Sequence, residues 1–396
     1  MLCFTASAGP TNAIVAANLP RTFLLDAKHL AATRQRIQTG DKSFEPALAA
    51  LKRDADRALE FEQVSVMDKP TTPPSGDKHD YMSQAPYFWP DPKSSNGLPY
   101  IRRDGEHNPE IRKIPDHKNI LEMPDAVETL ALQYYFSGDE HYAAKATHLL
   151  RVWFLNSATR MNPNLEYAQA VPGVNTGRGT GLIESPNLTK VVDAVGLLAG
   201  SKAWTANDQR GLKQWFTDYL RWMLDSKPGR AEAAAKNNHG TYYDLQVISF
   251  ALFLGNTNLA TQVAQAAREK RIAVQIEPDG SQPLELARTR AWGYSVANLS
   301  GLVSLATISE NVGVDLWNYQ SADGRSLRKA IDFLLPFALR EKQWSYQQLG
   351  GWSPGGFFPL LRRVALKIPN PQYRELAGRH APANPADRSV LLRPTL

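Results

Sequence analysis

The sequence predicts an all-α fold in which antiparallel helix hairpins follow one another along the chain. Two observations predict it: apolar residues recur at helical spacing in segment after segment, and short turns rich in Gly, Asn or Pro separate the segments. Strong strand signals are absent from roughly the first three hundred residues. Since no strict repeat period appears, we expect an (α/α) toroid, an incomplete α/α barrel with long cleft-lining loops, rather than an open repeat array.

The first helices are predicted by their apolar spacing and their end signals. Segment 44–61 places Leu48, Leu51, Ala55 and Leu59 on one face. Pro124 suits the start of a helix that runs to about Phe136, where Ser137-Gly138 stop it. Asp139 caps a further helix that runs to about Phe154, and another covers residues 188–198.

The second half of the chain continues the pattern. Thr205 and Asp208 form a capping-box pattern ahead of an apolar stripe, and Pro228-Gly229 end that helix. Residues 236–244 lead into an apolar run, 245–254, with 259–272 as its antiparallel partner. After the Asp279-Gly280 turn, helices are expected over about 284–308 and 327–339, followed by a tail rich in Trp, Gly and Pro.

Size and composition describe one globular unit. The chain has 396 residues, of which 43% are hydrophobic and 21% charged. No change of composition marks a domain boundary, so we expect one domain over residues 26–396. Residues 1–25 are expected to be a tail or the remnant of a signal peptide, because the apolar start lacks a positive n-region.

Charge and cysteine content exclude several classes of protein. A formal net charge of +6 and a pI near 9.2 suit an anionic substrate, but no Lys/Arg run or nucleic-acid motif is present. No apolar run approaches the roughly 20 residues that span a bilayer. The single Cys3 excludes an internal disulfide, and no metal-ligand spacing is evident, so we expect neither a metal nor another cofactor.

Two irregular segments are long enough to line a cleft. Residues 63–118 are rich in Pro, Gly and aromatic side chains and have no period. A segment of this length is typical of a lid or binding loop, although a surface loop pinned by its aromatic residues fits equally well. Residues 167–181 form a glycine-rich loop without the Lys-Ser/Thr of a phosphate site, and we expect Arg178 in it to face an acid.

The segment 236–244 carries the first candidate site. It places Asn237, Asn238 and His239 side by side, with Tyr242 shortly after them. Neutral amide donors beside a titratable imidazole suit the binding of a carboxylate while a neighbouring proton is removed. The alternative is a helix entry whose side chains only cap the backbone.

A second cluster lies in residues 282–298. On a continuous helix Arg290 and Tyr294 stand one turn apart on one side, where the arginine would favour the phenolate and lower a pKa of about 10. A more acidic tyrosine can remove a carbon-bound proton or return one to a leaving oxygen. The alternative is a core tyrosine beside solvated arginines.

Together these clusters resemble the alginate lyase family of α/α-toroid polysaccharide lyases. The residues that carry the resemblance are Asn237-Asn238-His239, Glu285-Leu-Ala-Arg288 and Tyr294, and it extends over about 81–337. The motif that begins at Tyr81 (Tyr-Met-Ser-Gln-Ala-Pro-Tyr-Phe-Trp-Pro) and the Gly-Arg-Gly around Arg178 are most similar to a branch with glucuronan-cleaving members.

The resemblance implies which residues form the active site, but it does not decide which arginine belongs to it. Its catalytic roles fall on Asn238, His239, Arg288 and Tyr294, and the family needs no cofactor. Gly240-Thr241 depart from the family pattern, and the Arg-to-Tyr interval is one residue shorter, so either Arg288 or Arg290 can be the active-site arginine. For substrate binding we expect Tyr81, Trp89, Arg178, Asn237, Tyr242 and Arg290.

The implied reaction is β-elimination on a polyuronate, either alginate with mannuronate-type linkages or glucuronan. Asn238, helped by His239 or an arginine, would neutralise the uronate carboxylate, and Tyr294 would move protons at C5 and at the C4 oxygen. Guluronate carries the C5 proton and the C4 oxygen on opposite faces of the ring. It would therefore need a second acid–base group, for which His239 is the candidate. An anionic polysaccharide is thus the expected partner, and a periplasmic or secreted location is expected.

Two other classes of protein are open at this point. A glycoside hydrolase on an α/α barrel needs two carboxylates flanking the scissile bond, and Glu184, Asp244 and Glu285 are available, although in no paired motif. A non-catalytic polysaccharide-binding protein would use the aromatic loops for binding and the Asn-His cluster for structure.

Overall fold

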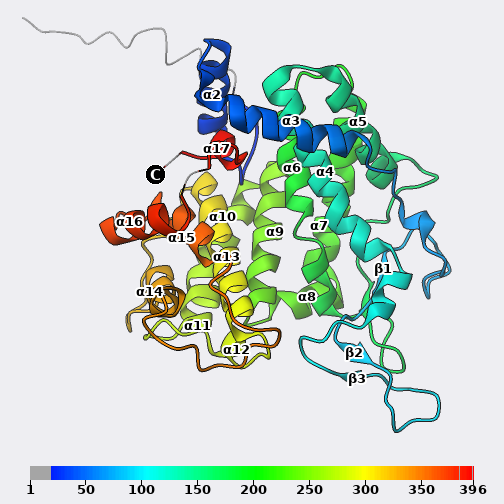
Figure 1. Cartoon of the computed structure of the whole chain (residues 1–396). Helices are drawn as coiled ribbons and strands as arrows, with labels where there is room; N and C mark the ends of the chain where they lie inside the picture. The colour runs from blue at the N-terminus through cyan, green and yellow to red at the C-terminus, as the bar shows by residue number, and fades with distance from the viewer. Residues whose placement is uncertain (1–18, 383, 395) are drawn as a thin grey trace, which may run out of the picture.

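The computed structural model describes residues 19–382, 384–394 and 396, and it confirms the predicted all-α fold (Figure 1). An inner row of long helices runs through the molecule, each packed on the next. This row consists of α4 (Asp116–Ser137), α6 (Leu188–Leu197), α9 (Asn238–Leu254) and α13 (Ala291–Ser309). Outer helices cover it: α5 (Glu140–Leu150) on α4, α7 (Ala206–Asp225) and α10 (Thr257–Ala267) on α9, and α14 (Leu327–Ala338) on α13.

The remaining elements lie around this row. At the upper end in Figure 1 lie α2 (Ala27–Gln38) and α3 (Glu45–Leu59), with α17 (Ser389–Leu392) below α2. Helices α15 (Phe357–Ala365) and α16 (Pro371–His380) lie on the left side, between α17 and α14. The lower end carries α8 (Lys227–Ala233), α11 (Ala273–Gln275), α12 (Pro283–Leu286) and the strands β2 and β3. The helices α15 to α17 were not predicted from the sequence.

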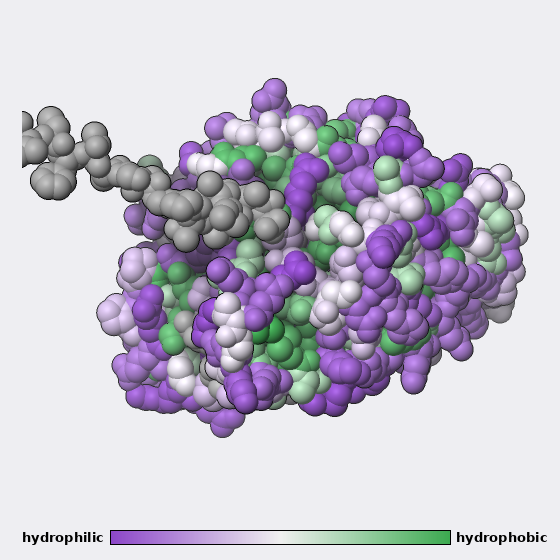
Figure 2. Space-filling model, turned by 90° about the horizontal axis from the view of Figure 1, so that it is seen from above, coloured by the Kyte–Doolittle hydropathy of each residue, from purple (hydrophilic) through white to green (hydrophobic). Residues whose placement is uncertain are grey.

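The amino-acid pattern explains which helices are inside. Nearly every residue of α9 from Thr241 to Phe253 is buried, as expected for a helix surrounded by others. In contrast α7 buries one stripe that includes Trp215, Phe216 and Tyr219, and its capping box of Thr205 and Asp208 is present as predicted. In the view from above, polar residues cover most of the surface, and hydrophobic residues show in separate patches (Figure 2).

Three predicted helix boundaries are wrong. Helix α4 begins at Asp116, so Pro124 lies inside the helix and not at its start. Pro228 and Gly229 lie inside α8, which Ser226 caps, and do not end α7. The helix predicted over 284–308 is interrupted between α12 and α13, because the backbone of Thr289 and Arg290 pairs with the segment around Gln348 instead.

Short strands join the two irregular segments. β1 (Met82–Gln84) pairs in parallel with β4 (Tyr167–Ala170), and β2 (Phe88–Trp89) pairs antiparallel with β3 (Ile101–Arg102). The first pair connects the loops predicted to line a cleft. As a result, they form one wall at the lower end of the inner helices.

The start of the described chain is anchored to the helical body. The backbone N–H groups of Phe23, Leu24 and Leu25 donate to the buried carboxylate of Asp193 on α6. The predicted tail or signal-peptide remnant covers residues 1–25, of which residues 1–18 lie outside the described residues. Within the described ranges, no helix combines the length and apolar character needed to cross a membrane.

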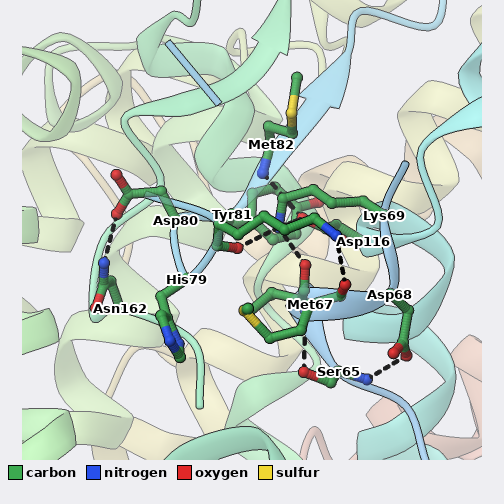
Figure 3. Close-up of polar contacts among 12 residues, drawn as sticks. Ser65, Met67, Asp68, Lys69, His79, Asp80, Tyr81, Met82, Asp116 and Asn162 are labelled. Carbon is green, nitrogen blue, oxygen red and sulfur yellow. Dashed lines mark hydrogen bonds and ion pairs between the residues drawn. The ribbon is translucent and has the colours of Figure 1, made fainter. Parts of the chain in front are cut away.

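A buried ion pair anchors the first irregular segment to α4. The ammonium of Lys69 lies 3.0 Å from Oδ2 of Asp116, and neither side chain is exposed (Figure 3). Lys69 also donates to the carbonyl of Lys78, and Asp116 accepts the backbone N–H of Met82 at 3.1 Å. Burial raises the pKa of Asp116 to about 6, although Lys69 opposes the shift, and burial lowers the pKa of Lys69.

Replacing Lys69 by Met is expected to destabilise the fold in a pH-dependent way. At pH 8 the change leaves a buried carboxylate without its cation, which costs about 3–5 kcal/mol. Since the folded variant then binds a proton on Asp116 more tightly than the unfolded chain does, its stability deficit shrinks as the pH falls through the raised pKa. Urea unfolding at pH 5 and pH 8 measures this. An equal deficit at both pH values would contradict it, and the double variant Lys69→Met/Asp116→Asn should recover stability at pH 8.

Candidate active site

The N-terminus of α9 is held by an arginine from outside the helix. Arg271 lies in a π-helical turn, Arg268–Ile272, and its buried guanidinium makes a bidentate ion pair with Asp244 of α9. The same group donates to the carbonyls of Ala233 and Ala235, just ahead of α9. A Cβ on Gly240 would collide with the Ala235 carbonyl and with Arg271, so only glycine fits there. This packing fixes the backbone on which Asn238 and His239 stand.

Asn238 is buried at the first position of α9 and is bound by an acid. Its backbone N–H donates to Oε1 of Glu285 at 2.9 Å, and its Nδ2 donates to Oε2 at 3.3 Å. Its Oδ1 is buried and has no hydrogen-bond partner among the described residues. Donation to the Glu285 carboxylate places the amide nitrogen on that side, and it leaves the second N–H and Oδ1 without a hydrogen bond among the described residues.

His239 is oriented by a second buried acid. Its Nδ1 lies 2.7 Å from Oε1 of Glu232 on α8, and the Glu232 side chain is only 2% exposed. The imidazole is itself 19% exposed. With Nδ1 in a hydrogen bond to the Glu232 carboxylate, Nε2 is the ring nitrogen without a partner among the described residues.

Because the chain is not helical between α12 and α13, Arg288 and not Arg290 contacts Tyr294. The guanidinium carbon of Arg288 lies 3.8 Å from the centre of the Tyr294 ring, stacked on its face. Arg288 also binds Asp104 through Nε (3.0 Å to Oδ2) and Nη2 (2.7 Å to Oδ1). Burial lowers the pKa of Arg288, but the hydrogen bonds with Asp104 and the charges of Tyr294, Asp104 and Glu285 together outweigh burial and raise the pKa. These bonds also hold the pKa of Asp104 well below its usual value, against its burial.

The predicted lowering of the Tyr294 pKa is wrong. Burial raises the pKa of Tyr294 well above its ordinary value, and the Tyr87 hydroxyl, which accepts the Tyr294 hydroxyl at 2.7 Å, raises it further. The cation of Arg288 does favour the phenolate, but less strongly. Tyr294 is thus a neutral phenol in this state, and the predicted effect of a neighbouring arginine is outweighed by desolvation.

Glu285 connects the two halves of the site. It binds Asn238 directly, and its charge interacts with those of His239 and Arg288, the arginine stacked on Tyr294. Burial raises the pKa of Glu285. Helices α9, α12 and α13 therefore bring Asn238, His239, Arg288 and Tyr294 into one neighbourhood, although the two clusters lie about fifty residues apart in the chain.

Tyr81 is not positioned to bind a ligand. Its side chain is fully buried, and its hydroxyl donates to Glu184 at 2.6 Å. Ser83 donates to the same carboxylate, which lies 3.3 Å from Nδ1 of His117. The prediction of Tyr81 as a substrate-binding residue is therefore wrong: an aromatic residue in a loop can anchor the loop from inside.

Arg178 and Trp89 lie on the wall formed by the joined loops. Arg178 donates to Oε1 of Gln169 at 2.7 Å and lies over the Phe88 ring. Burial lowers the pKa of Arg178, and the nearby acids Glu184 and Glu232 oppose this. Trp89 is partly exposed, has Arg103 over its ring, and donates its indole N–H to the Glu106 carbonyl.

The other three predicted binding residues lie around the same helix ends. Asn237 is partly exposed at the N-cap of α9, where its side chain makes no capping hydrogen bond. Tyr242 lies one turn into α9 and donates to the Ala297 carbonyl. Arg290 is exposed at the N-cap of α13 and not within the helix, so its predicted alignment with Tyr294 is wrong.

Sequence reasoning missed residues that meet the site from other parts of the chain. These are Tyr87 beside Tyr294, Asp104 on Arg288, Glu232 on His239, and His107, which packs edge-on against Tyr87 at 5.1 Å. Tyr87 lies within the motif that begins at Tyr81, so the sequence did indicate that the segment around Tyr87 matters. Nothing in the sequence indicated Asp104, which lies 184 positions from Arg288.

The carboxylates that a hydrolase would need are occupied. Glu184 accepts hydrogen bonds from Tyr81 and Ser83, Asp244 is paired with Arg271, and Glu285 binds Asn238. These acids therefore serve as structural partners and do not form a pair across an open cleft. Among the described residues, no group of three or more His, Cys, Asp or Glu side chains gathers as metal ligands would.

Comparison with known proteins finds a family model and solved structures that are similar to this chain. The alginate lyase family model matches residues 65–344. The crystal structure of an alginate lyase from Bacteroides ovatus is 43% identical, with 94% of this chain and 99% of that chain covered and a TM-score of 0.90. Alginate lyase A1-III from Sphingomonas species A1 shares the fold, with 15% identity, coverage of 98% and 100%, and a TM-score of 0.59.

A further solved structure shows a relative with a bound sugar. A His-to-Ala variant of alginate lyase A1-III, complexed with a tetrasaccharide, matches at 16% identity and a TM-score of 0.60, with 98% of this chain and 100% of that chain covered. No curated protein matched the chain.

Proposed function

Because this chain belongs to the alginate lyase family and is a polysaccharide lyase acting on a polyuronate, we propose that it cleaves mannuronate-type or glucuronate linkages by β-elimination. Asn238, His239, Arg288 and Tyr294 are the proposed catalytic residues. The observation that carries the proposal is a buried amide bound to Glu285, whose charge also interacts with Arg288, the arginine stacked on the Tyr294 phenol.

Neutralising the uronate carboxylate is the first task. The C5 proton is hardly acidic while the carboxylate is charged, because its removal builds a dianion. The free N–H of Asn238 donates to one carboxylate oxygen. The second ring nitrogen of His239, held in place by Glu232, contacts the same group.

Tyr294 then serves as base and acid on one face of the sugar. Mannuronate and glucuronate carry the C5 hydrogen and the C4 oxygen on the same face, so one phenol reaches both. The phenolate that removes the C5 proton is favoured by Arg288, and the Tyr87 hydroxyl can rotate to donate to it. The proton taken from C5 passes to the C4 oxygen as the glycosidic bond breaks. On guluronate, His239 would act as the second group.

Incubation with polymannuronate, polyguluronate and glucuronan tests the proposal. Elimination creates a double bond conjugated to the carboxylate, so ultraviolet absorbance rises with each cleavage, whereas hydrolysis produces no such signal. We expect absorbance to rise with polymannuronate or glucuronan and more slowly with polyguluronate. A rise with polyguluronate alone would refute the single-face mechanism, and new reducing ends without absorbance would refute elimination.

Arg288 is proposed as the active-site arginine in preference to Arg290. Arg288→Ala removes the cation stacked on Tyr294 and is expected to lower kcat about 100-fold, within the range of lost transition-state electrostatics. Arg290→Ala, an exposed neighbour, is expected to change kcat less than about threefold because exposed charges contribute little. Steady-state kinetics of the two variants decide, and the reverse order would assign the role to Arg290.

The location of the enzyme follows from the substrate. A polyuronate is too large and too charged to cross a membrane unaided, so we propose a periplasmic or secreted enzyme. Fractionation of cells that express the full chain measures this: activity confined to the cytosolic fraction would refute it.

A further inference from the structure

A pocket lined by arginines lies between α15 and α17, apart from the catalytic residues. It has a volume of about 210 Å³ and is formed by side chains of both helices and of the chain on either side of α17. Of the described residues that line it, none is a proposed catalytic residue. Those that carry a charge are three arginines and one acid: Arg362, Arg363, Arg393 and Asp387. Positive charges therefore outnumber negative ones in this pocket.

The pocket lies between helices from opposite ends of the chain. Helix α15 packs on α13, α14 and α16, whereas α17 packs on α2 and α3. In Figure 1, α17 lies below α2, and α15 and α16 follow between α17 and α14. A ligand that contacts both α15 and the residue after α17 therefore links the last helices of the fold to the first.

The hydrogen bonds of these arginines go to neutral groups. Arg362 donates to the Ala381 carbonyl at 2.9 Å, and Arg363 donates to Oγ of Ser304 at 3.2 Å. Within the described parts of the chain, neither Arg363 nor Arg393 is hydrogen-bonded to an acid. The oxygens of an anion in the pocket would meet guanidinium N–H groups that no carboxylate binds.

Burial and repulsion between like charges both act on the two arginines that face each other. Burial lowers the pKa of Arg363 to about 10, and the charge of Arg393 adds to this shift, while the Tyr242 phenol opposes it. Burial also lowers the pKa of Arg393, although the charges of Glu128 and Asp387 oppose the shift. An anion between two such cations replaces lost hydration and screens their repulsion.

We propose that this pocket binds a small tetrahedral oxyanion, of the phosphate or sulfate class, between Arg363 of α15 and Arg393 after α17. The planar guanidinium group matches the spacing of oxygens in such an anion. The volume lies below the roughly 300–1,000 Å³ of sites for larger organic ligands, which favours a small ion. The bound ion holds the segment after α17 against α15 and so stabilises the fold. This role does not depend on the proposed function.

Calorimetry of the full chain with phosphate, at an ionic strength kept constant with chloride, tests the proposal. We expect the wild type to bind phosphate, and Arg363→Gln and Arg393→Gln each to weaken binding about 10-fold or more, as expected for a lost charge-assisted hydrogen bond. The matched control is Arg374→Gln, which removes an exposed arginine of α16 outside the pocket and should bind as the wild type does.

Asp387→Asn changes the charge of the pocket in the opposite direction. Asp387 is exposed, and its Oδ1 accepts the backbone N–H of Ser389 at 2.8 Å, a bond that an asparagine can keep. Removal of the acid should strengthen phosphate binding roughly two- to fivefold, the usual effect of one exposed charge. Unchanged or weaker binding in this variant would contradict an anion at this position.

Thermal unfolding gives a second readout that is independent of catalysis. Phosphate and sulfate should raise the Tm of the wild type, because a ligand that binds only the folded state stabilises it, and should raise it less in Arg363→Gln. A cooperative transition in chloride shows that each variant is folded. The absence of phosphate binding by the wild type would overturn the proposal, and so would equal binding in the wild type and both arginine variants. Glucuronate that binds the pocket more tightly than phosphate would overturn the tetrahedral class of ligand.

Discussion

Tyr294→Phe is expected to abolish the formation of unsaturated product while the protein stays folded and binds its substrate. The change removes only the hydroxyl that donates to Tyr87, and the ring that stacks on Arg288 remains. A single group that acts as both base and acid contributes about 10²–10⁴-fold in each role, so a loss of at least about 10³-fold in kcat is expected. Absorbance of the product measures kcat, and calorimetry with polymannuronate or glucuronan measures binding.

The dependence of kcat on pH in the wild type tests the role of Tyr294 independently. Burial and Tyr87 raise the pKa of Tyr294, so its phenolate becomes more populated as the pH increases. We therefore expect kcat to rise from pH 7 toward alkaline pH until the protein itself unfolds. Tyr142→Phe, which removes a hydroxyl bound to Asp56 far from the site, is the matched control and should keep the wild-type profile. Full activity in Tyr294→Phe would refute the mechanism.

The second large effect is expected from Asn238→Ala. The change removes the buried amide proposed to neutralise the uronate carboxylate, and it leaves the backbone N–H that donates to Glu285. Loss of one donor aimed at developing charge costs about 10²–10³-fold in kcat, or about 2.7–4 kcal/mol. KM should change much less, because the lost interaction is strongest in the transition state.

Asn238→Asp tests the effect of an added negative charge at this position while the side-chain shape stays nearly the same. The aspartate has nearly the same volume, but it places a second carboxylate beside Glu285 and opposite the substrate acid. We expect it to be at least as inactive as the alanine variant near pH 7 and to recover part of its activity toward pH 5, where it is more often protonated. Thermal unfolding of both variants controls for the fold, and a wild-type kcat in Asn238→Ala would refute the role of the amide.

Sequence patterns predicted those features that depend only on contacts between residues close together in the chain. The capping box of Thr205 and Asp208, the Asp139 cap and the stripe of α7 are contacts within a few residues, and they were predicted correctly. The start of α4 was not, because the helix is extended by a buried contact between Asp116 and Lys69, which comes from a distant loop. The break before α13 likewise depends on pairing with the segment around Gln348.

The same distinction applies to the candidate site. Asn238 and His239 could be singled out because they are adjacent, but this segment alone fits a helix entry equally well. The second cluster and the family resemblance favoured a site. The partners Glu285 and Glu232 were not recognised in these roles, since any buried acid in the sequence fits equally well. Tyr81 was misassigned because nothing in its local sequence shows whether a loop aromatic faces inward or outward.

By itself, then, the sequence determined the helical hairpins, the family resemblance and the residue types at the two clusters. Only the tertiary structure decided that Arg288 stacks on Tyr294 while Arg290 faces solvent, that Asp104 and Tyr87 complete this group, and that the tyrosine is a neutral phenol. The physical reason is that hydrogen bonding and hydrophobic periodicity act along the chain, whereas desolvation and ion pairing depend on which distant segments exclude water from a group.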